Sequence, residues 1–297
     1  MRLRNPLLVL ALAAAVAVAV VLIARGGKSS DKISLAGFQA SDAKRDAVLW
    51  AVGDGPDGND PARQVGRLIA RSKPDRVLYL GDVYEHGTAQ EFDTHYANAF
   101  GGFAKRTAPT PGNHDWPNRV VGYMPYWTKV TGRKVPNYYT FSTGGWKLMS
   151  LNSEMPHGPH SPQVRWLDSE LKGPGDCRIA FWHRPRYSAG DHHGDQPDVQ
   201  PFWDELKGHA VLVLNGHEHD MQRFAPKHGI TELVSGAGGH GLYGLNQLYP
   251  GLAFGNDSSF GALRLELTRG VAKYRFVSTD GRTLDSGSTK CRASRPA

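Results

Sequence analysis

The stretch that decides the fold is RVLYLGDVY, residues 76–84, in which an apolar run is followed at once by a glycine and a carboxylate. A short apolar run that ends in a glycine-containing turn is typical of a buried β-strand. We therefore predict a strand over residues 76–80 that ends at Gly81 and Asp82. The stretch TAPTPGNHD, residues 107–115, repeats the arrangement, with a strand over residues 107–110 before Asn113 and His114.

Three more apolar runs end in the same way, at residues 47–52, 178–182 and 210–214. The first precedes Asp54, the second precedes His183, and the third precedes His217 and His219. A helix is expected over residues 61–72, and further strands at residues 146–151, 231–235, 261–267 and 272–278. Strands that alternate with helices and are followed by consecutive strands predict an α/β domain with a mixed sheet or two packed sheets.

Five strand ends thus carry side chains of the kinds that bind metals. They are Asp54, Asp82, Asn113, His183 and the pair His217 and His219. Ligands of open α/β sheets bind at the carboxyl ends of the strands, so these side chains are expected to meet. Carboxylates, an amide oxygen and imidazoles together suit zinc, manganese or iron, whereas a purely thiolate or purely oxygen site is excluded.

The order of these motifs resembles the calcineurin-like metallophosphoesterases, and in particular the purple acid phosphatases and their exported bacterial relatives. The motifs are Gly53-Asp54, Gly81-Asp82-Val83-Tyr84, Gly112-Asn113-His114-Asp115, Trp182-His183 and Gly216-His217-Glu218-His219. The resemblance implies a four-layer α/β/β/α sandwich and two metal ions, iron with zinc or manganese. It implies that Asp82 bridges the metals, that Asp54 and His219 bind the first, and that Asn113, His183 and His217 bind the second.

Tyr84 is the candidate for the remaining ligand of the first metal. Much of the superfamily has a histidine two residues after the first aspartate, where this chain has Pro56. The purple acid phosphatases supply a tyrosine instead, three residues after the bridging aspartate. Tyr84 lies only two residues after Asp82, and one residue changes the face that a side chain takes on an extended chain. His86 is the alternative ligand.

The resemblance implies hydrolysis of phosphate esters, with Asp82 and His114 in the catalytic machinery and His114 protonating the leaving group. Two metals clamp the phosphate and lower the pKa of a shared water, which attacks as hydroxide. Arg184 and His193 are candidate contacts for the phosphorylated small-molecule substrate, although a solvated loop or surface charge would also explain them. A phosphomonoesterase is the first expectation. A phosphodiesterase acting on nucleotides or lipid head groups, and a non-catalytic metal-stabilised binding module, are the alternatives.

The net charge of +7 is concentrated near the N-terminus, where residues 1–32 hold five basic residues and one acidic residue. The remainder carries 30 basic and 27 acidic residues. A nucleic-acid-binding domain usually has a dense basic stripe, and no such stripe is present in the rest of the sequence. We therefore expect no nucleic-acid partner, whereas the sequence leaves the oligomeric state open.

Residues 7–24 are all apolar and follow Arg2 and Arg4. As a helix they would rise about 27 Å, close to the thickness of a thin hydrocarbon core. Residues 1–25 are therefore a signal peptide or an uncleaved membrane anchor. Residues 26–45 would be a linker, 46–292 the metallophosphoesterase domain and 293–297 a tail. Either reading places the domain outside the cytoplasm, secreted or anchored to a membrane.

The chain has two cysteines, Cys177 and Cys291. In an exported protein two such cysteines plausibly form one disulfide. Unpaired burial in the core is the alternative.

Overall fold

The computed structural model describes residues 39, 41–42, 46–173 and 177–291, and all of these belong to one compact unit. The predicted apolar helix over residues 7–24 lies outside the described residues. Within the described part, no helix has the length and apolar character needed to cross a membrane.

The first sheet has six strands and contains the apolar run that begins at Arg76. Its order is β13 (Thr283–Lys290), β12 (Val271–Ser278), β11 (Gly261–Thr268), β1 (Ala47–Val52), β2 (Arg76–Tyr79) and β3 (Thr107–Pro109). Strands β1, β2 and β3 are parallel, and β11 pairs antiparallel with β1. Nearly every side chain of β1 and β2 is buried, as expected for strands covered on both faces.

The second sheet has seven strands, of which four run parallel in its centre. Its order is β10 (Leu252–Asn256), β8 (Met221–Phe224), β9 (Thr231–Ser235), β7 (Leu212–Asn215), β6 (Arg178–Phe181), β5 (Trp146–Ser150) and β4 (Tyr139–Thr143). Strands β5, β6, β7 and β9 are parallel neighbours. Both sheets therefore present several carboxyl ends at one edge.

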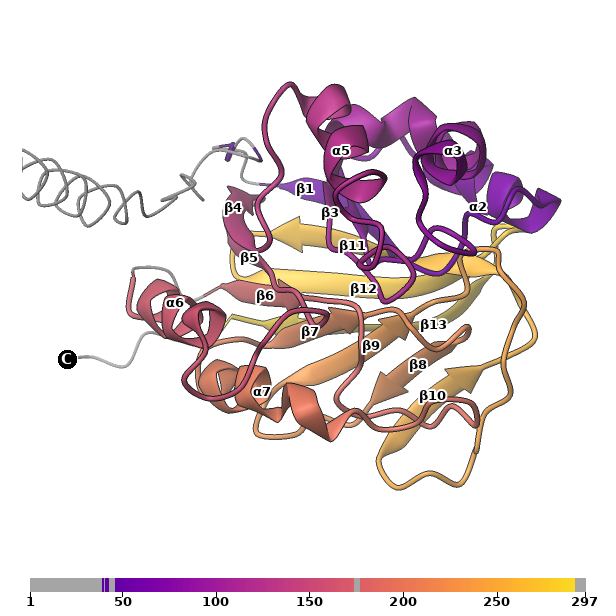
Figure 1. Cartoon of the computed structure of the whole chain (residues 1–297). Helices are drawn as coiled ribbons and strands as arrows, with labels where there is room; N and C mark the ends of the chain where they lie inside the picture. The colour runs from indigo at the N-terminus through magenta and orange to yellow at the C-terminus, as the bar shows by residue number, and fades with distance from the viewer. Residues whose placement is uncertain (1–38, 40, 43–45, 174–176, 292–297) are drawn as a thin grey trace, which may run out of the picture. The chain divides into compact units, whose positions relative to one another are not determined.

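Helices cover the outer face of each sheet, so the unit has four layers (Figure 1). On the first sheet lie α2 (Asp60–Arg71), α3 (Ala89–Glu91), α4 (Ala97–Phe100) and α5 (Tyr123–Thr131), with helical turns at Phe92–Tyr96 and Gly101–Arg106. On the second lie α6 (Pro162–Leu171), α7 (Gln200–Leu206) and the turn Pro197–Val199. The predicted four-layer sandwich is confirmed.

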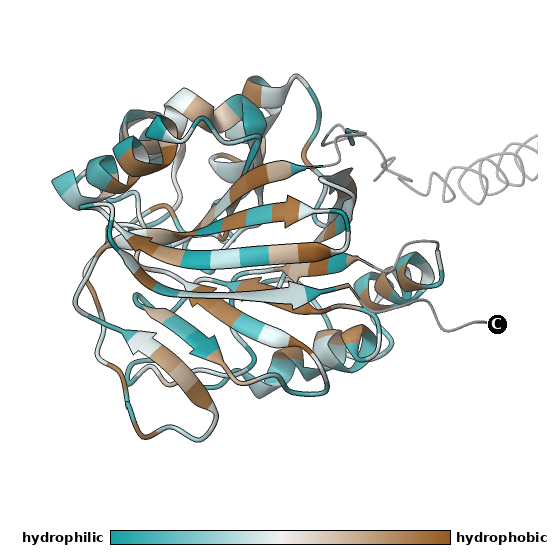
Figure 2. Ribbon diagram, turned by 180° about the vertical axis from the view of Figure 1, so that it is seen from behind, coloured by the Kyte–Doolittle hydropathy of each residue, from teal (hydrophilic) through white to brown (hydrophobic). Residues whose placement is uncertain are grey.

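The interior between the layers is built from aromatic and branched apolar side chains. One core cluster holds residues of both sheets, among them Leu49, Leu78, Leu148 and Leu265. A second cluster lies between the second sheet and helices α6 and α7. Strand β11 alternates buried apolar and partly exposed polar residues from Leu263 onward, and this alternation is visible from behind (Figure 2). The alternation is typical of a sheet with one face toward water.

Local sequence explains where helix α2 begins. The side chain of Asn59 accepts a hydrogen bond from the backbone N–H of Ala62, and Pro61 occupies the first turn. Both choices are favoured at a helix N-terminus, because the first N–H groups have no partner within the helix. The expected helix over 61–72 is therefore found one residue earlier.

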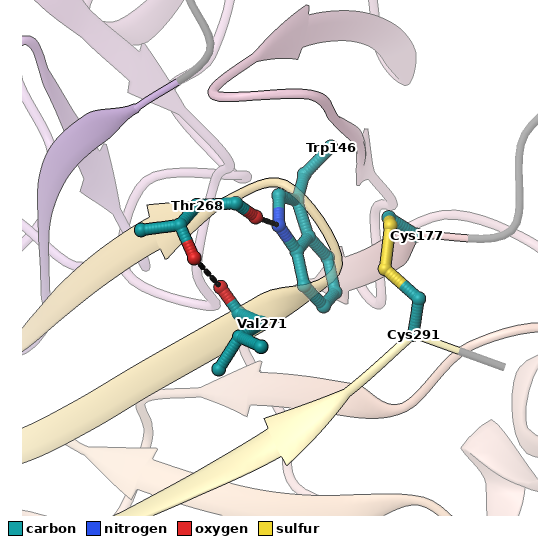
Figure 3. Close-up of a disulfide and its surroundings, with 5 residues drawn as sticks. All are labelled: Trp146, Cys177, Thr268, Val271 and Cys291. Atoms are coloured by element: carbon teal, nitrogen blue, oxygen red, sulfur yellow. Dashed lines mark hydrogen bonds between the residues drawn. A yellow bond between two sulfur atoms is a disulfide. The ribbon is translucent and has the colours of Figure 1, made fainter.

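The predicted disulfide between Cys177 and Cys291 is present, with the two Cα atoms 4.6 Å apart. Cys177 directly precedes β6, and Cys291 directly follows β13, so the bond joins the two sheets (Figure 3). A hydrogen bond from the Trp146 indole to the Thr268 carbonyl oxygen links the sheets in the same region.

Candidate metal centre

The turns after β1, β2 and β7 bring the candidate ligands together through an unusual backbone conformation. Asp54, Asp82 and His217 have positive φ angles of 58°, 70° and 74°. Left-handed backbone is uncommon for residues other than glycine and costs on the order of 1 kcal/mol or more. Such strain is typical of sites where the surrounding structure fixes functional side chains.

One half-site surrounds the Nε2 atom of His183. This nitrogen lies 3.0 Å from Asn113 Oδ1, 3.1 Å from His217 Nδ1 and 3.2 Å from Asp82 Oδ2. Ligands that each bind one ion at about 2.1 Å lie roughly 3.0–3.4 Å from one another. Asp82, His183 and His217 each offer one ligand atom, and these three atoms all lie within 4.8 Å of one another.

The other half-site surrounds the hydroxyl of Tyr84. It lies 2.7 Å from His219 Nε2, 3.2 Å from Asp54 Oδ1 and 3.4 Å from Asp82 Oδ2. The structure thus places Tyr84, despite its shift by one position, with the aspartates and with His219. The alternative residue His86 is exposed and lies in the pocket beside His114. The same oxygen of Asp82 is shared by both half-sites.

The hydrogen-bonding state of the histidines leaves their inward nitrogens available to a metal. The Nδ1 atoms of His183 and His219 face the carbonyl oxygens of Leu80 and Gly241 at 2.8 and 2.7 Å. A carbonyl oxygen can only accept, so each Nδ1 carries a hydrogen, which is the usual second-shell arrangement of a metal-binding histidine. The donor atoms present therefore fit two metal ions.

Burial and neighbouring charges shift the pKa values of the candidate ligands in opposite directions. Burial lowers the pKa of His219 to about 3 and that of His217 strongly, so both are neutral imidazoles, the form that binds metals. Burial also acts to lower the pKa of His183, but the charges of Asp82 and Asp54 raise that pKa to about 10. Burial raises the pKa of Asp54 well above its usual range. Metal binding at such a site releases protons.

His114 and Asp115, which follow Asn113, both form hydrogen bonds with the turn that carries Asp82. The backbone N–H of His114 donates to Asp82 Oδ1 at 2.9 Å, and its Nδ1 lies 2.5 Å from the Glu85 carbonyl oxygen. The buried carboxylate of Asp115 accepts from the backbone N–H groups of Gly112, Asp82 and Val83. The hydrogen bonds of Asp115 therefore link the turns that follow β2 and β3.

The two candidate substrate contacts lie in different surroundings. The ring of His193 stacks on that of His217 with the centroids 3.9 Å apart, so His193 borders the second half-site. The guanidinium of Arg184 instead forms a two-pronged ion pair with Glu154, in which Nε donates to Oε1 at 2.9 Å and Nη2 donates to Oε2 at 3.1 Å. Because its guanidinium is paired with Glu154, Arg184 is less available to a phosphate than we expected from the sequence.

Three residues to which the sequence assigned no role shape the centre. Tyr243 stacks on His219 at 3.8 Å, and His240 stacks on Tyr84 at 3.9 Å. The carboxylate of Glu218 is fully buried and accepts from the backbone N–H groups of His193 and Gly194. The position of Glu218 between His217 and His219 is the only sequence signal that could have indicated its role.

Comparison with known proteins agrees with this geometry. The family model described as Calcineurin-like phosphoesterase matches residues 35–221. The chain is 23% identical over 175 residues to Fe(3+)-Zn(2+) purple acid phosphatase 12 of Arabidopsis thaliana, covering 51% of this chain and 37% of that one. It is 24% identical over 212 residues to tartrate-resistant acid phosphatase type 5 of Rattus norvegicus, covering 60% and 64%. The match thus spans less than two thirds of either relative.

Solved structures show the same fold. GAP50, the anchor in the inner membrane complex of Plasmodium, aligns with a TM-score of 0.68 at 14% identity, over 84% of this chain and 90% of that one. The purple acid phosphatase PPD1 of yellow lupin aligns with a TM-score of 0.63 at 14% identity, over 85% and 54%.

Proposed function

The chain belongs to the calcineurin-like phosphoesterase family, and from that premise we propose that it is a metal-dependent phosphomonoesterase. The observation that carries the proposal is the convergence of two sets of donor atoms on one shared carboxylate, Asp82. The proposed ligands are Asp54, Asp82, Tyr84 and His219 for the first metal, and Asp82, Asn113, His183 and His217 for the second.

The chemistry of the donors supports iron in the first position with zinc or manganese in the second. A phenol and two carboxylates favour a hard ion, whereas two imidazoles and an amide oxygen suit zinc or manganese. The printed name of the Arabidopsis relative includes both iron and zinc. This supports the pair but leaves the native metals as part of the proposal.

When bound, the two metals would orient the phosphate and activate water. The remaining steps belong to side chains. Asp82 holds the two half-sites in register, because its Oδ2 faces both His183 and Tyr84. His114 donates a proton to the leaving alkoxide, and the Glu85 carbonyl oxygen fixes its ring. His193, on the rim beside His217, donates to a phosphate oxygen.

Monoesters are favoured over diesters because the curated relatives are named acid phosphatases. A diesterase acting on nucleotides or lipid head groups is the runner-up. A non-catalytic role is the alternative of another class, and the structural likeness to a protein named an anchor gives it a specific basis. The complete donor set, with His114 beside it, argues for catalysis.

The disulfide supports a location outside the cytoplasm, since such bonds persist in oxidising compartments. Export through residues 1–25, with or without retention as an anchor, remains part of the proposal.

The test uses the full chain, loaded with iron, zinc or manganese, and assayed on an aryl monoester, an alkyl monoester and an aryl diester. We expect turnover of the monoesters and loss of turnover with a chelator. Turnover of the diester alone would replace the monoesterase by a diesterase. Bound metal without any turnover would contradict the enzymatic proposal.

A substitution at His114 tests its role as the acid. His114→Ala should lower kcat for the alkyl ester about 100-fold or more, but kcat for the aryl ester much less, because a phenolate leaves without a proton. His160→Ala, in an exposed loop, is the matched control. Equal losses on both esters would count against proton donation by His114.

A further inference from the structure

A small pocket opens directly beside the proposed proton donor. Its volume is about 130 Å³, and it is lined by Glu85, His86, Asn113, His114, Pro117 and Asn118. Asn113 also faces His183 in the second half-site. Asn113 therefore borders both the pocket and the second half-site.

The proposed reaction assigns this pocket to the leaving group. The Nδ1 atom of His114 is engaged by the Glu85 carbonyl oxygen, so Nε2 is the nitrogen that meets the substrate. A proton donor must lie within hydrogen-bond reach of the leaving oxygen. The alcohol part of the ester must then lie against the residues that surround His114.

The segment that carries Glu85 and His86 is held firmly. Their backbone N–H groups donate to the two carboxylate oxygens of Glu91, at 2.8 and 3.1 Å. The amide of Asn118 donates to the His86 carbonyl oxygen at 2.8 Å. Because backbone bonds fix the segment, the Glu85 side chain can change without moving the turn.

Glu85 and Asn118 give the pocket side-chain oxygens that can accept hydrogen bonds. The Glu85 carboxylate is 59% exposed, with Oε1 3.7 Å from His240 Nε2. The donation by Asn118 leaves its side-chain oxygen as a second acceptor. Neither lysine nor arginine is among the six lining residues.

We propose that this pocket selects the leaving group, and that Glu85 favours esters of small amino alcohols or polyols and disfavours esters that carry a second anion. With a volume of about 130 Å³, the pocket has room for a group of a few heavy atoms. An anionic substituent would meet the Glu85 carboxylate, and no lysine or arginine lines the pocket to offset the repulsion. This inference rests on the proposed phosphomonoesterase activity.

The experiment compares three phosphate monoesters of nearly equal size, with 2-aminoethyl, 2-hydroxyethyl and carboxymethyl leaving groups. In the metal-loaded full chain, kcat/KM should fall in that order, by about tenfold between the extremes at low salt. Exposed charges interact weakly, so the spread should shrink in high salt. Glu85→Gln should reduce it to about twofold or less, and Glu85→Lys should reverse the order.

A merely structural role of Glu85 would change kcat/KM for all three esters by the same factor in Glu85→Gln, whereas the proposed role changes the ratio between them. Asp168→Asn, on helix α6, is the control for loss of a remote carboxylate and should keep the wild-type order. If the esters are hydrolysed without a spread, or with one that Glu85→Gln leaves unchanged, the inference is wrong and the proposed activity stands. If none of the three is hydrolysed but the aryl monoester is, the inference is wrong and the proposed activity stands. If no monoester is hydrolysed, both are wrong.

Discussion

At the scale of single residues, the centre brings together buried carboxylates, imidazole nitrogens and the hydroxyl of Tyr84, all of which can bind a metal. Asp54 and Asp82 are fully buried carboxylates, and His219 presents a bare Nε2 to the Tyr84 hydroxyl. Buried charges and lone pairs are unfavourable without a cation or donors. Bound metal ions would satisfy these groups, so each proposed ligand can be tested by its effect on metal binding.

Tyr84→Phe removes one hydroxyl and keeps the ring that stacks on His240. We expect the iron-loaded protein to lose its visible phenolate-to-iron absorption band and to bind the first metal more weakly. Tyr243→Phe, beside His219, is the matched control and should keep the band. Absence of any such band in the iron-loaded wild type would contradict ligation by Tyr84.

Asp115→Asn tests the residue that fastens two ligand-bearing turns. Its carboxylate accepts three backbone N–H groups, whereas an asparagine offers one oxygen and turns an amide group toward a donor. We expect metal affinity, measured by competition with a chelator, to fall about 10- to 100-fold, as for other second-shell changes. Asp60→Asn, which changes an exposed carboxylate at the start of helix α2, should leave the metal affinity unchanged. Unchanged affinity in Asp115→Asn would show that the turns hold without this residue.

At this scale the sequence predicted which residues meet but missed how they are held. The sequence identified six candidate ligands because each follows an apolar run. They are Asp54, Asp82, Asn113, His183, His217 and His219. The position of Tyr84 was ambiguous, since a register argument for extended chain does not apply to the turn in which it lies. Glu218 and Tyr243 gain their roles from contacts between segments far apart in sequence, which periodicity does not report.

At the scale of elements, strands were predicted better than helices. The run at 76–80 became β2 (Arg76–Tyr79), because a buried parallel strand needs continuous apolar residues. Helix α5 (Tyr123–Thr131) and the edge strand β10 (Leu252–Asn256) were missed. The buried residues Tyr123, Tyr126 and Trp127 of α5 recur at helical spacing, but Pro125 lies among them. The partly exposed residues of β10 give no clear period.

The loop between β6 and helix α7 is the element that carries His193, and Glu218 anchors it. The buried carboxylate accepts from His193 and Gly194, and a side chain at Gly190 would collide with it. Glu218→Ala should release the loop and raise KM about tenfold. Glu218→Gln keeps one acceptor oxygen and should recover most of the loss. Metal content must stay constant in both variants, and a fall in it would assign Glu218 to the metal site instead.

At the scale of the whole unit, the disulfide and the metal centre lie at opposite ends of the same strand. Cys177 precedes β6, whereas His183 follows it. The bond spans 114 residues of sequence and joins β6 to the end of edge strand β13. Closing a loop of about that length stabilises the folded state by up to roughly 5 kcal/mol in the chain-entropy model. Its contribution should therefore be to stability and not to chemistry.

The double variant Cys177→Ser/Cys291→Ser separates these two properties. We expect the free energy of unfolding in denaturant to fall by about 2–5 kcal/mol, with a lower Tm, because the unfolded chain regains the entropy of the open loop. Metal content and kcat at temperatures where the variant stays folded should match the wild type. Reduction of the wild type should reproduce the loss of stability but have no effect on the double variant. A fall in metal content in the folded variant would show instead that the bond shapes the centre through β6.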